Sequence, residues 1–228
     1  MFFDSYYLIL VVPAMLLALW AQMRVQSTFS RFQKVRSDSG YSGADVARRI
    51  LDNNGLYDVR IEQVSGTLTD HYDPRDRVVR LSQSVYASTS VAAIGVAAHE
   101  TGHAVQHAKA YVPLTMRNAI IPITNIGSQL SLPLILVGFL LSAPSLVQLG
   151  IVAFSLMCVF QLITLPVEFN ASNRAMAVLE QDGILRGSEL NDTRKVLSAA
   201  ALTYVAALIV SIAQLLRLIL LFGRRRND

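Results

Sequence analysis

The composition of this 228-residue chain excludes an ordinary soluble domain, because 53% of its residues are hydrophobic and only 16% are charged, against about a quarter charged in soluble proteins. The net charge is +4. The excess lies beside apolar segments and not in a basic run interleaved with aromatic residues, so the sequence predicts a lipid bilayer and no nucleic acid as partner. The single cysteine excludes an intrachain disulfide.

The first apolar segment predicts an N-terminal transmembrane anchor over residues 1–23. A cleaved signal peptide is the alternative, but it would begin with basic residues, and this start carries Asp4. No basic residue precedes the segment, whereas four follow it closely: Arg24, Arg31, Lys34 and Arg36. The positive-inside rule then places the following residues in the cytosol.

Residues 24–118 are more polar and predict a cytosolic catalytic domain with both helices and strands. An amphipathic helix is expected from Ser42 to Leu51, with Gly55 as its stop. An alternating strand over residues 59–64 is followed by a strand pair around a proline-containing turn at residues 73–76. Serines at 88 and 90 are suited to cap the next helix.

That next helix carries H-E-x-x-H, the strongest functional signal in the chain. Residues four apart lie on one helix face, so His99 and His103 can both direct a ring nitrogen at one zinc ion. Glu100 lies about 100° further round the helix, where a carboxylate can act as general base towards a water molecule. An ordinary helix with two histidines is the alternative interpretation.

The rest of the chain predicts a transmembrane helical hairpin over residues 119–166 and a helix with a polar connector over 167–198. The last segment, 199–228, is a membrane helix with a basic tail. It either spans the bilayer or lies on its surface, because a full span would put the arginines at 224–226 outside, against the charge rule.

A catalytic zinc ion has three protein ligands, so a third must join the two histidines. Glu168 is our choice, because the hairpin returns it to the membrane face on which the zinc helix lies. The alternative is an interfacial glutamate that reaches into water, and spacing alone does not separate the two. His107 lies one turn beyond His103, and three turns spread ligands over about 12 Å, too far for one ion.

His107 is therefore expected to support a ligand, contact substrate or lie at the interface. His71 precedes the 73–76 turn and could line the cleft as an electrophilic helper. With one Zn²⁺ bound, the expected reaction is hydrolysis of a peptide bond, with Glu100 as the base. A strand such as Val78–Leu81 could hold an extended peptide by edge pairing.

Four stretches together resemble the YugP-type family of bacterial membrane zinc metallopeptidases, also called neutral zinc metallopeptidases. The likeness covers nearly the whole chain. Its stretches are Leu68–Pro74, Val79–Ser82, Ala98–His107 and Pro166–Ala175.

The resemblance implies a gluzincin-like site with His99, His103 and Glu168 on zinc and Glu100 as base. It extends to membrane metalloproteases that process prenylated proteins or degrade damaged membrane proteins, which have a Glu-aromatic-x-Ala-Asp block. Here Ser172 replaces that aspartate, so Asn173 or Asn170 would orient a ligand histidine, or the role is absent.

The sequence as a whole predicts an α-helical membrane protein of three to four transmembrane helices with a small α+β gluzincin-like zinc protease domain. It is expected to be a multi-pass zinc metalloendopeptidase of the bacterial inner membrane, with its catalytic domain in the cytoplasm. Its substrates would be proteins or peptides at the membrane. The alternatives are a non-catalytic zinc-binding scaffold or sensor and a transporter, for which only Arg217 is an ionisable group within a span.

Overall fold

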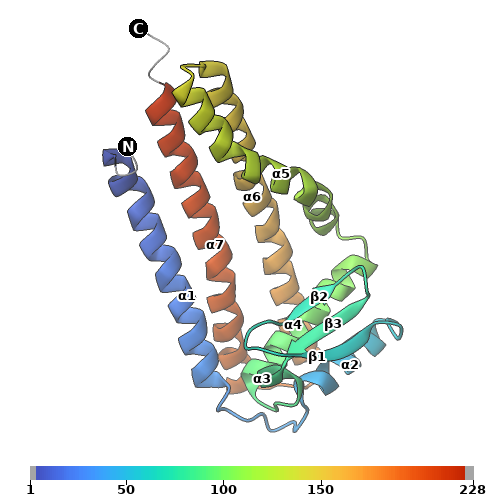
Figure 1. Cartoon of the computed structure of the whole chain (residues 1–228). Coiled ribbons are helices and arrows are strands. Elements are labelled where there is room, and N and C mark those ends of the chain that lie inside the picture. Colours follow the sequence, from blue (N-terminus) through green and yellow to red (C-terminus); the bar gives the residue numbers. More distant parts are fainter. Residues whose placement is uncertain (1–3, 224–228) are drawn as a thin grey trace. The chain divides into compact units, whose positions relative to one another are not determined.

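The computed structural model describes residues 4–223, which are mostly helical (Figure 1). In chain order the described elements are the π-helix η1 (Tyr7–Val11), α1 (Val12–Phe32), α2 (Gly43–Asn53), β1 (Arg60–Val64), β2 (His71–Asp73), β3 (Val78–Ser82), α3 (Gln83–Tyr86), α4 (Val91–Ala108), α5 (Val112–Leu140), α6 (Pro144–Gln181) and α7 (Ser188–Gly223).

The chain divides into two compact units. The helical unit comprises Met1–Gln22, Thr115–Pro166 and Leu202–Asp228, and the α+β unit comprises Met23–Leu114 and Val167–Ala201. Each unit has its own set of internal contacts, and they are described separately below.

Within residues 4–223, four helices are long and apolar enough to cross a membrane, in agreement with the three to four that the sequence predicts. They cover Tyr7–Phe32, Val112–Leu140, Pro144–Gln181 and Ser188–Phe222. The last segment, for which a surface position was the alternative, meets the same criteria as the others. The arginines at 224–226 lie outside the described residues.

The α5–α6 hairpin of the helical unit is packed through small residues. The Ser131 hydroxyl donates a hydrogen bond to the Gly150 carbonyl at 2.9 Å. A Cβ atom at Gly150 would lie 2.8 Å from the Ser131 carbonyl oxygen, so only glycine permits this approach.

The predicted boundary between the hairpin and the following helix lies at residue 166, whereas α6 continues through Pro166, from Pro144 to Gln181. Proline removes one backbone donor, which usually ends a helix in water. In an apolar environment no water can bond to the carbonyl that the proline leaves without a donor. Ending the helix would expose more backbone groups in the same way, so the helix continues on both sides of the proline.

An ion pair links α7 of the helical unit to Asp4, which lies before η1. Arg217 of α7 donates to the Asp4 carboxylate from Nη2 at 2.6 Å and from Nε at 3.0 Å. The guanidinium carbon also lies 5.1 Å from the centroid of the Tyr7 ring. Arg217, the residue that kept a transporter among the alternatives, is thus neutralised within its own unit.

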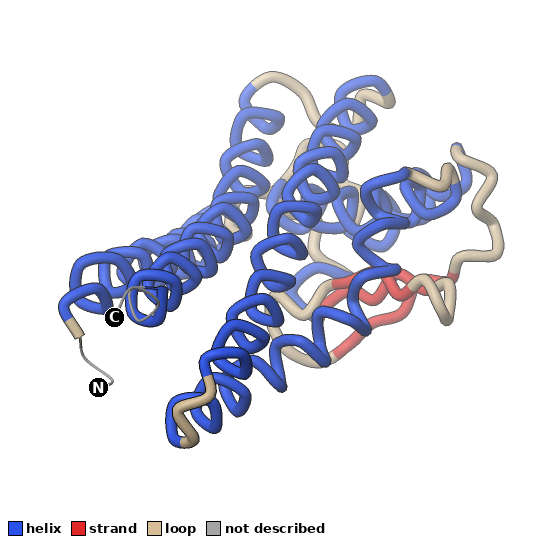
Figure 2. Tube along the Cα trace, turned by 90° about the horizontal axis from the view of Figure 1, so that it is seen from above, coloured by secondary structure: helices blue, strands red, loops and turns tan. Residues whose placement is uncertain are grey.

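The α+β unit contains one three-stranded sheet, whose strands are red in Figure 2. The strand order is β1-β3-β2. β1 pairs with β3 in parallel, and β2 pairs with β3 antiparallel. The expectation that Val78–Leu81 could bind a peptide by edge pairing is therefore wrong, because β3 is the central strand and both its edges are hydrogen-bonded. The short strand β2 is one of the two edges.

The helices of this unit begin at predicted caps and pack on a buried apolar core. Ser42 and Asp45 form a reciprocal capping box at the start of α2. Ser90 accepts a hydrogen bond from the Ala93 amide at the start of α4. The core is formed by side chains from α2, the sheet, α4 and the C-terminal part of α6, among them Leu51, Leu81, Ile94 and Leu179. This core fixes the zinc-motif helix against α6.

Candidate metal centre

The two motif histidines lie one turn apart on α4, as their spacing requires. Their ring centroids are 4.8 Å apart and the ring planes are nearly perpendicular, at 86°. Both side chains are about seven-eighths buried. Their Nε2 atoms face the same carboxylate, described next.

That carboxylate belongs to Glu168 of α6, which is 3% exposed. Its Oε2 atom lies 3.4 Å from His99 Nε2 and 3.5 Å from His103 Nε2. The three ligand-type atoms lie within 4.8 Å of one another, and they form the group of this kind found among the described residues. The structure thus brings together the three side chains that the sequence named as zinc ligands.

Gly102 explains why α6 can approach α4 so closely. A Cβ atom on Gly102 would lie 3.0 Å from the carbonyl oxygen of Ala171. This residue of the H-E-T-G-H motif therefore faces the backbone of α6, one turn beyond Glu168. Because Gly102 has no side chain, α4 and α6 can pack closely enough for the two histidines and Glu168 to meet.

The two nitrogen–oxygen separations fit a zinc ion. Zinc–nitrogen and zinc–oxygen bonds of about 2.0–2.2 Å place the ligand atoms of a tetrahedral site about 3.3–3.6 Å apart. Both measured nitrogen–oxygen separations, 3.4 and 3.5 Å, fall in that range. A buried carboxylate between two imidazoles is also the mixed nitrogen and oxygen donor set that catalytic zinc uses.

A buried glutamine determines the tautomer of His103. Gln106, which is fully buried, donates from Nε2 to the carbonyl oxygen of Val167 at 2.8 Å. A carbonyl only accepts, so this bond fixes which end of the amide is the NH₂ group. The Gln106 Oε1 atom must then accept from His103 Nδ1, 3.0 Å away. His103 accordingly carries a proton on Nδ1, which makes Nε2 the ring atom that faces Glu168 and would bind a metal ion.

The network around Gln106 extends to Asn170 and Arg174 on α6. Gln106 Nε2 also donates to Asn170 Oδ1 at 3.0 Å, and the same oxygen accepts from Arg174 Nε at 2.7 Å. An arginine nitrogen only donates, so the Asn170 amide is oriented as well. Asn170, one of the two asparagines considered for orienting a histidine, thus acts on His103 through Gln106.

Ser172 itself contacts His99, with its hydroxyl 3.1 Å from Nδ1. Ser172, which the resemblance predicts to replace an aspartate, is thus a neutral group beside a ligand-type histidine. Asn173 is exposed and makes no hydrogen bond among the described residues, so the structure does not bring it to the site.

The charge environment of His103 is set by two opposing effects. Burial by itself would lower the pKa of this imidazole. The hydrogen bond to Glu168 and the negative charges of Glu100 and Glu168 outweigh burial, and they raise the pKa above its ordinary value. The site is therefore suited to hold positive charge, as a bound divalent cation would supply.

Glu100 is half-buried, and its carboxylate has no hydrogen-bond or ion-pair partner within residues 4–223. Its charge also acts on Asp70, whose pKa is raised by burial and by Glu100 and lowered by hydrogen bonds from Ser82. Asp70 accepts from the Ser82 amide at 2.7 Å and from its hydroxyl at 3.0 Å, which ties the segment before β2 to the end of β3.

The two remaining histidines lie outside the three-residue cluster. His107 Nδ1 is 2.9 Å from the Tyr72 hydroxyl of β2, so His107 links α4 to the edge strand. His71 is exposed on β2, and its Nδ1 atom donates to the Thr69 carbonyl at 2.8 Å. Neither histidine is a ligand in this arrangement.

Sequence reasoning missed Gln106 and Tyr72. The position of Gln106 was a usable signal: it follows His103 by three residues and so lies on the same helix face, where a buried polar side chain needs hydrogen-bond partners. The position of Tyr72 depends on the pairing of β2 with β3, which no local pattern specifies.

Four candidate membrane spans together with a two-histidine, one-glutamate cluster are the combination expected of a membrane zinc peptidase. The chain belongs to the neutral zinc metallopeptidase family: the family model described as "Putative neutral zinc metallopeptidase" matches residues 7–223. The chain is 52% identical over 222 residues to the "Putative membrane protease YugP" of Bacillus subtilis (strain 168), covering 97% of this chain and 99% of that protein. No solved structure was found to match the chain.

Proposed function

We propose that this protein is an integral-membrane zinc metalloendopeptidase that processes or degrades membrane proteins. The observation that carries the proposal is the cluster of His99, His103 and Glu168, whose ligand atoms lie within 4.8 Å of one another. Membership of a zinc-peptidase family supports the choice of metal and of reaction.

In this proposal His99, His103 and Glu168 hold one zinc ion. Bound there, the ion would lower the pKa of a water molecule and polarise the scissile carbonyl. Glu100 takes a proton from the attacking water and returns it to the leaving amine, which its unpaired carboxylate permits. Gln106 and Ser172 hold the imidazoles with Nδ1 protonated, so that both Nε2 atoms remain available as ligands.

The substrate and the side of the membrane form the second part of the proposal. Basic residues follow the first apolar helix and none precedes it. We therefore propose that the α+β unit lies on the cytoplasmic side of a bacterial inner membrane. Protein segments at the cytoplasmic membrane surface are the proposed substrates. The exposed edge of β2 replaces β3 as the candidate for pairing with an extended peptide.

The test compares wild type with Glu100→Gln in purified full-length protein, measuring zinc content and cleavage of an unfolded membrane-protein substrate. Both proteins should bind one zinc per chain, and the variant should cleave about 10²–10⁴-fold more slowly. Undiminished cleavage by the zinc-loaded variant would contradict the role of Glu100. Zinc binding without cleavage by wild type, across a panel of membrane substrates, would favour the scaffold or sensor alternative.

A further inference from the structure

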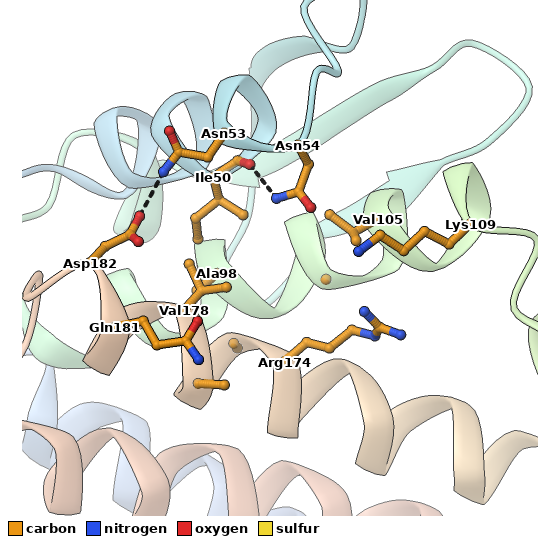
Figure 3. Close-up of a pocket in the computed structure, with 13 residues that line it drawn as sticks. Ile50, Asn53, Asn54, Ala98, Val105, Lys109, Arg174, Val178, Gln181 and Asp182 are labelled. Atoms are coloured by element: carbon orange, nitrogen blue, oxygen red, sulfur yellow. Dashed lines mark hydrogen bonds between the residues drawn. The ribbon is translucent and has the colours of Figure 1, made fainter.

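The α+β unit contains a cavity of about 350 Å³ that the metal centre does not use (Figure 3). It lies between α2, α4 and α6, and its lining excludes all three proposed zinc ligands. Its size falls in the range of small-molecule sites. Its apolar lining includes Ile50 of α2, Val105 of α4 and Val178 of α6.

Two cationic side chains line the same end of this cavity. Figure 3 shows the amine of Lys109 and the guanidinium of Arg174 on one side of the pocket, each on a different helix. Within residues 4–223 no carboxylate lies within ion-pair distance of either group. The Arg174 Nε atom is used by Asn170, which leaves the two terminal nitrogens of the guanidinium for a ligand.

The acidic residue that lines the cavity is already engaged at the opposite end. Asp182 accepts a hydrogen bond from Asn53 at 2.8 Å and lies 3.8 Å from Arg49 Nε. It follows Arg174 by eight residues on α6, a rise of about 12 Å. Asp182 therefore does not neutralise the positive charges of Lys109 and Arg174.

We propose that this cavity binds an amphipathic anion. A carboxylate or phosphate group would lie between Lys109 and Arg174, with a short apolar body against the side chains of Ile50, Val105 and Val178. A planar guanidinium offers paired donors to such an anion, and a flexible ammonium adds a second charge. This site does not depend on the proposed peptidase activity.

Arg174 belongs both to this pocket and to the network that ends at His103. Its Nε atom holds Asn170, and Asn170 holds Gln106. Lys109 has no such connection. Substitution of Arg174 should therefore weaken both zinc binding and anion binding, whereas substitution of Lys109 should weaken anion binding alone.

The experiment follows the melting temperature of the full-length protein in a neutral detergent at constant ionic strength. The probes are acetate, hexanoate and hexyl phosphate, which separate the anionic group from the apolar body and a carboxylate from a phosphate. The proteins are wild type, Lys109→Gln, Arg174→Gln and Asn170→Ala. Arg75→Gln is the control, because it removes an equal charge from an exposed turn.

Wild type and Arg75→Gln should show saturable stabilisation, with hexanoate or hexyl phosphate binding about tenfold or more tightly than acetate. Lys109→Gln and Arg174→Gln should each lose about tenfold in affinity for the anion. Zinc affinity should fall in Arg174→Gln and Asn170→Ala and stay unchanged in Lys109→Gln. The absence of saturable stabilisation in wild type would overturn the proposal, as would equal stabilisation in all the proteins.

Discussion

The amide of Gln106 accepts the Nδ1 proton of His103, and the carbonyl of Val167 fixes that amide in the required orientation. This relationship selects the histidine tautomer before any metal arrives. The residues involved come from two helices, so the protonation of a ligand on α4 depends on the backbone of α6. Four predictions follow from this site and its surroundings, and a fifth concerns the topology.

Replacement of Gln106 by alanine should weaken zinc binding about 10–100-fold, because His103 loses the acceptor that holds its tautomer and ring orientation. Competition with a chromogenic chelator would measure the affinity. Gln181→Ala is a suitable control, since it shortens a glutamine on α6 away from the histidines. Unchanged zinc affinity in Gln106→Ala would show that His103 needs no such support.

Ser172 should contribute to zinc affinity through His99. Ser172→Ala removes the group 3.1 Å from Nδ1 and should weaken binding by about tenfold. Ser172→Asp should bind zinc more tightly than Ser172→Ala, since a carboxylate is a stronger acceptor for the imidazole N–H. Chelator competition on the two variants side by side tests the order. The reverse order would mean that His99 is oriented by other contacts.

Gly102→Ala should separate α4 from α6, because the new methyl group would lie 3.0 Å from the Ala171 carbonyl oxygen. The expected results are weaker zinc binding and a loss of about 1–3 kcal/mol in stability. Helix propensity alone predicts the opposite sign, a gain of about 1 kcal/mol. A melting curve and a zinc titration on one sample therefore distinguish close packing from propensity.

Asp70 should give the protein a pH dependence that Asp70→Asn lacks. Burial raises the pKa of Asp70 in the folded state, so its proton is held to a higher pH than in the unfolded chain. The resulting stabilisation is fully present below the pKa of Asp70 in the unfolded chain, about 3.9. It is lost as the pH rises through the higher pKa of Asp70 in the folded protein. The melting temperature of wild type should fall relative to Asp70→Asn between about pH 4 and pH 7. The lost hydrogen bonds to Ser82 add an offset that does not depend on pH. A relative rise in wild type would contradict the assigned direction.

Reporter fusions test the orientation of the chain. Four spans would place the two termini on the same side, and the basic residues after the first helix put residue 60 in the cytosol. A fusion after Arg60 should give a cytosolic signal, and a fusion at Asp228 should give an external one. An external signal at Arg60 would reverse the proposed orientation.

The sequence was most informative where one local pattern determines the geometry. The spacing of His99 and His103 requires a shared helix face, and Ser42 and Ser90 mark helix starts by their own hydrogen bonds. The π-helix at the start of the first span and the continuation of α6 through Pro166 were not predictable in this way. They depend on an apolar environment that changes the usual cost of breaking backbone hydrogen bonds.

The details around the proposed ligands required the fold. Glu168 was named with an interfacial glutamate as an equal alternative, because its 65-residue separation from His103 leaves the contact to tertiary packing. The role of Gln106 depends on a carbonyl of another helix. The order of the strands, which removed Val78–Leu81 as a peptide-binding edge, depends on a parallel pairing that hydrophobic alternation does not encode.

The Asp4–Arg217 ion pair has a consequence for the last helix. Arg217 lies on α7, whereas its counter-ion Asp4 lies before η1, at the other end of the described chain. Loss of Asp4, by proteolysis or by deletion, would leave a mostly buried guanidinium without its counter-ion, at a cost of several kcal/mol. The charge balance of α7 thus depends on a residue more than two hundred positions away, which lies before the first described helix.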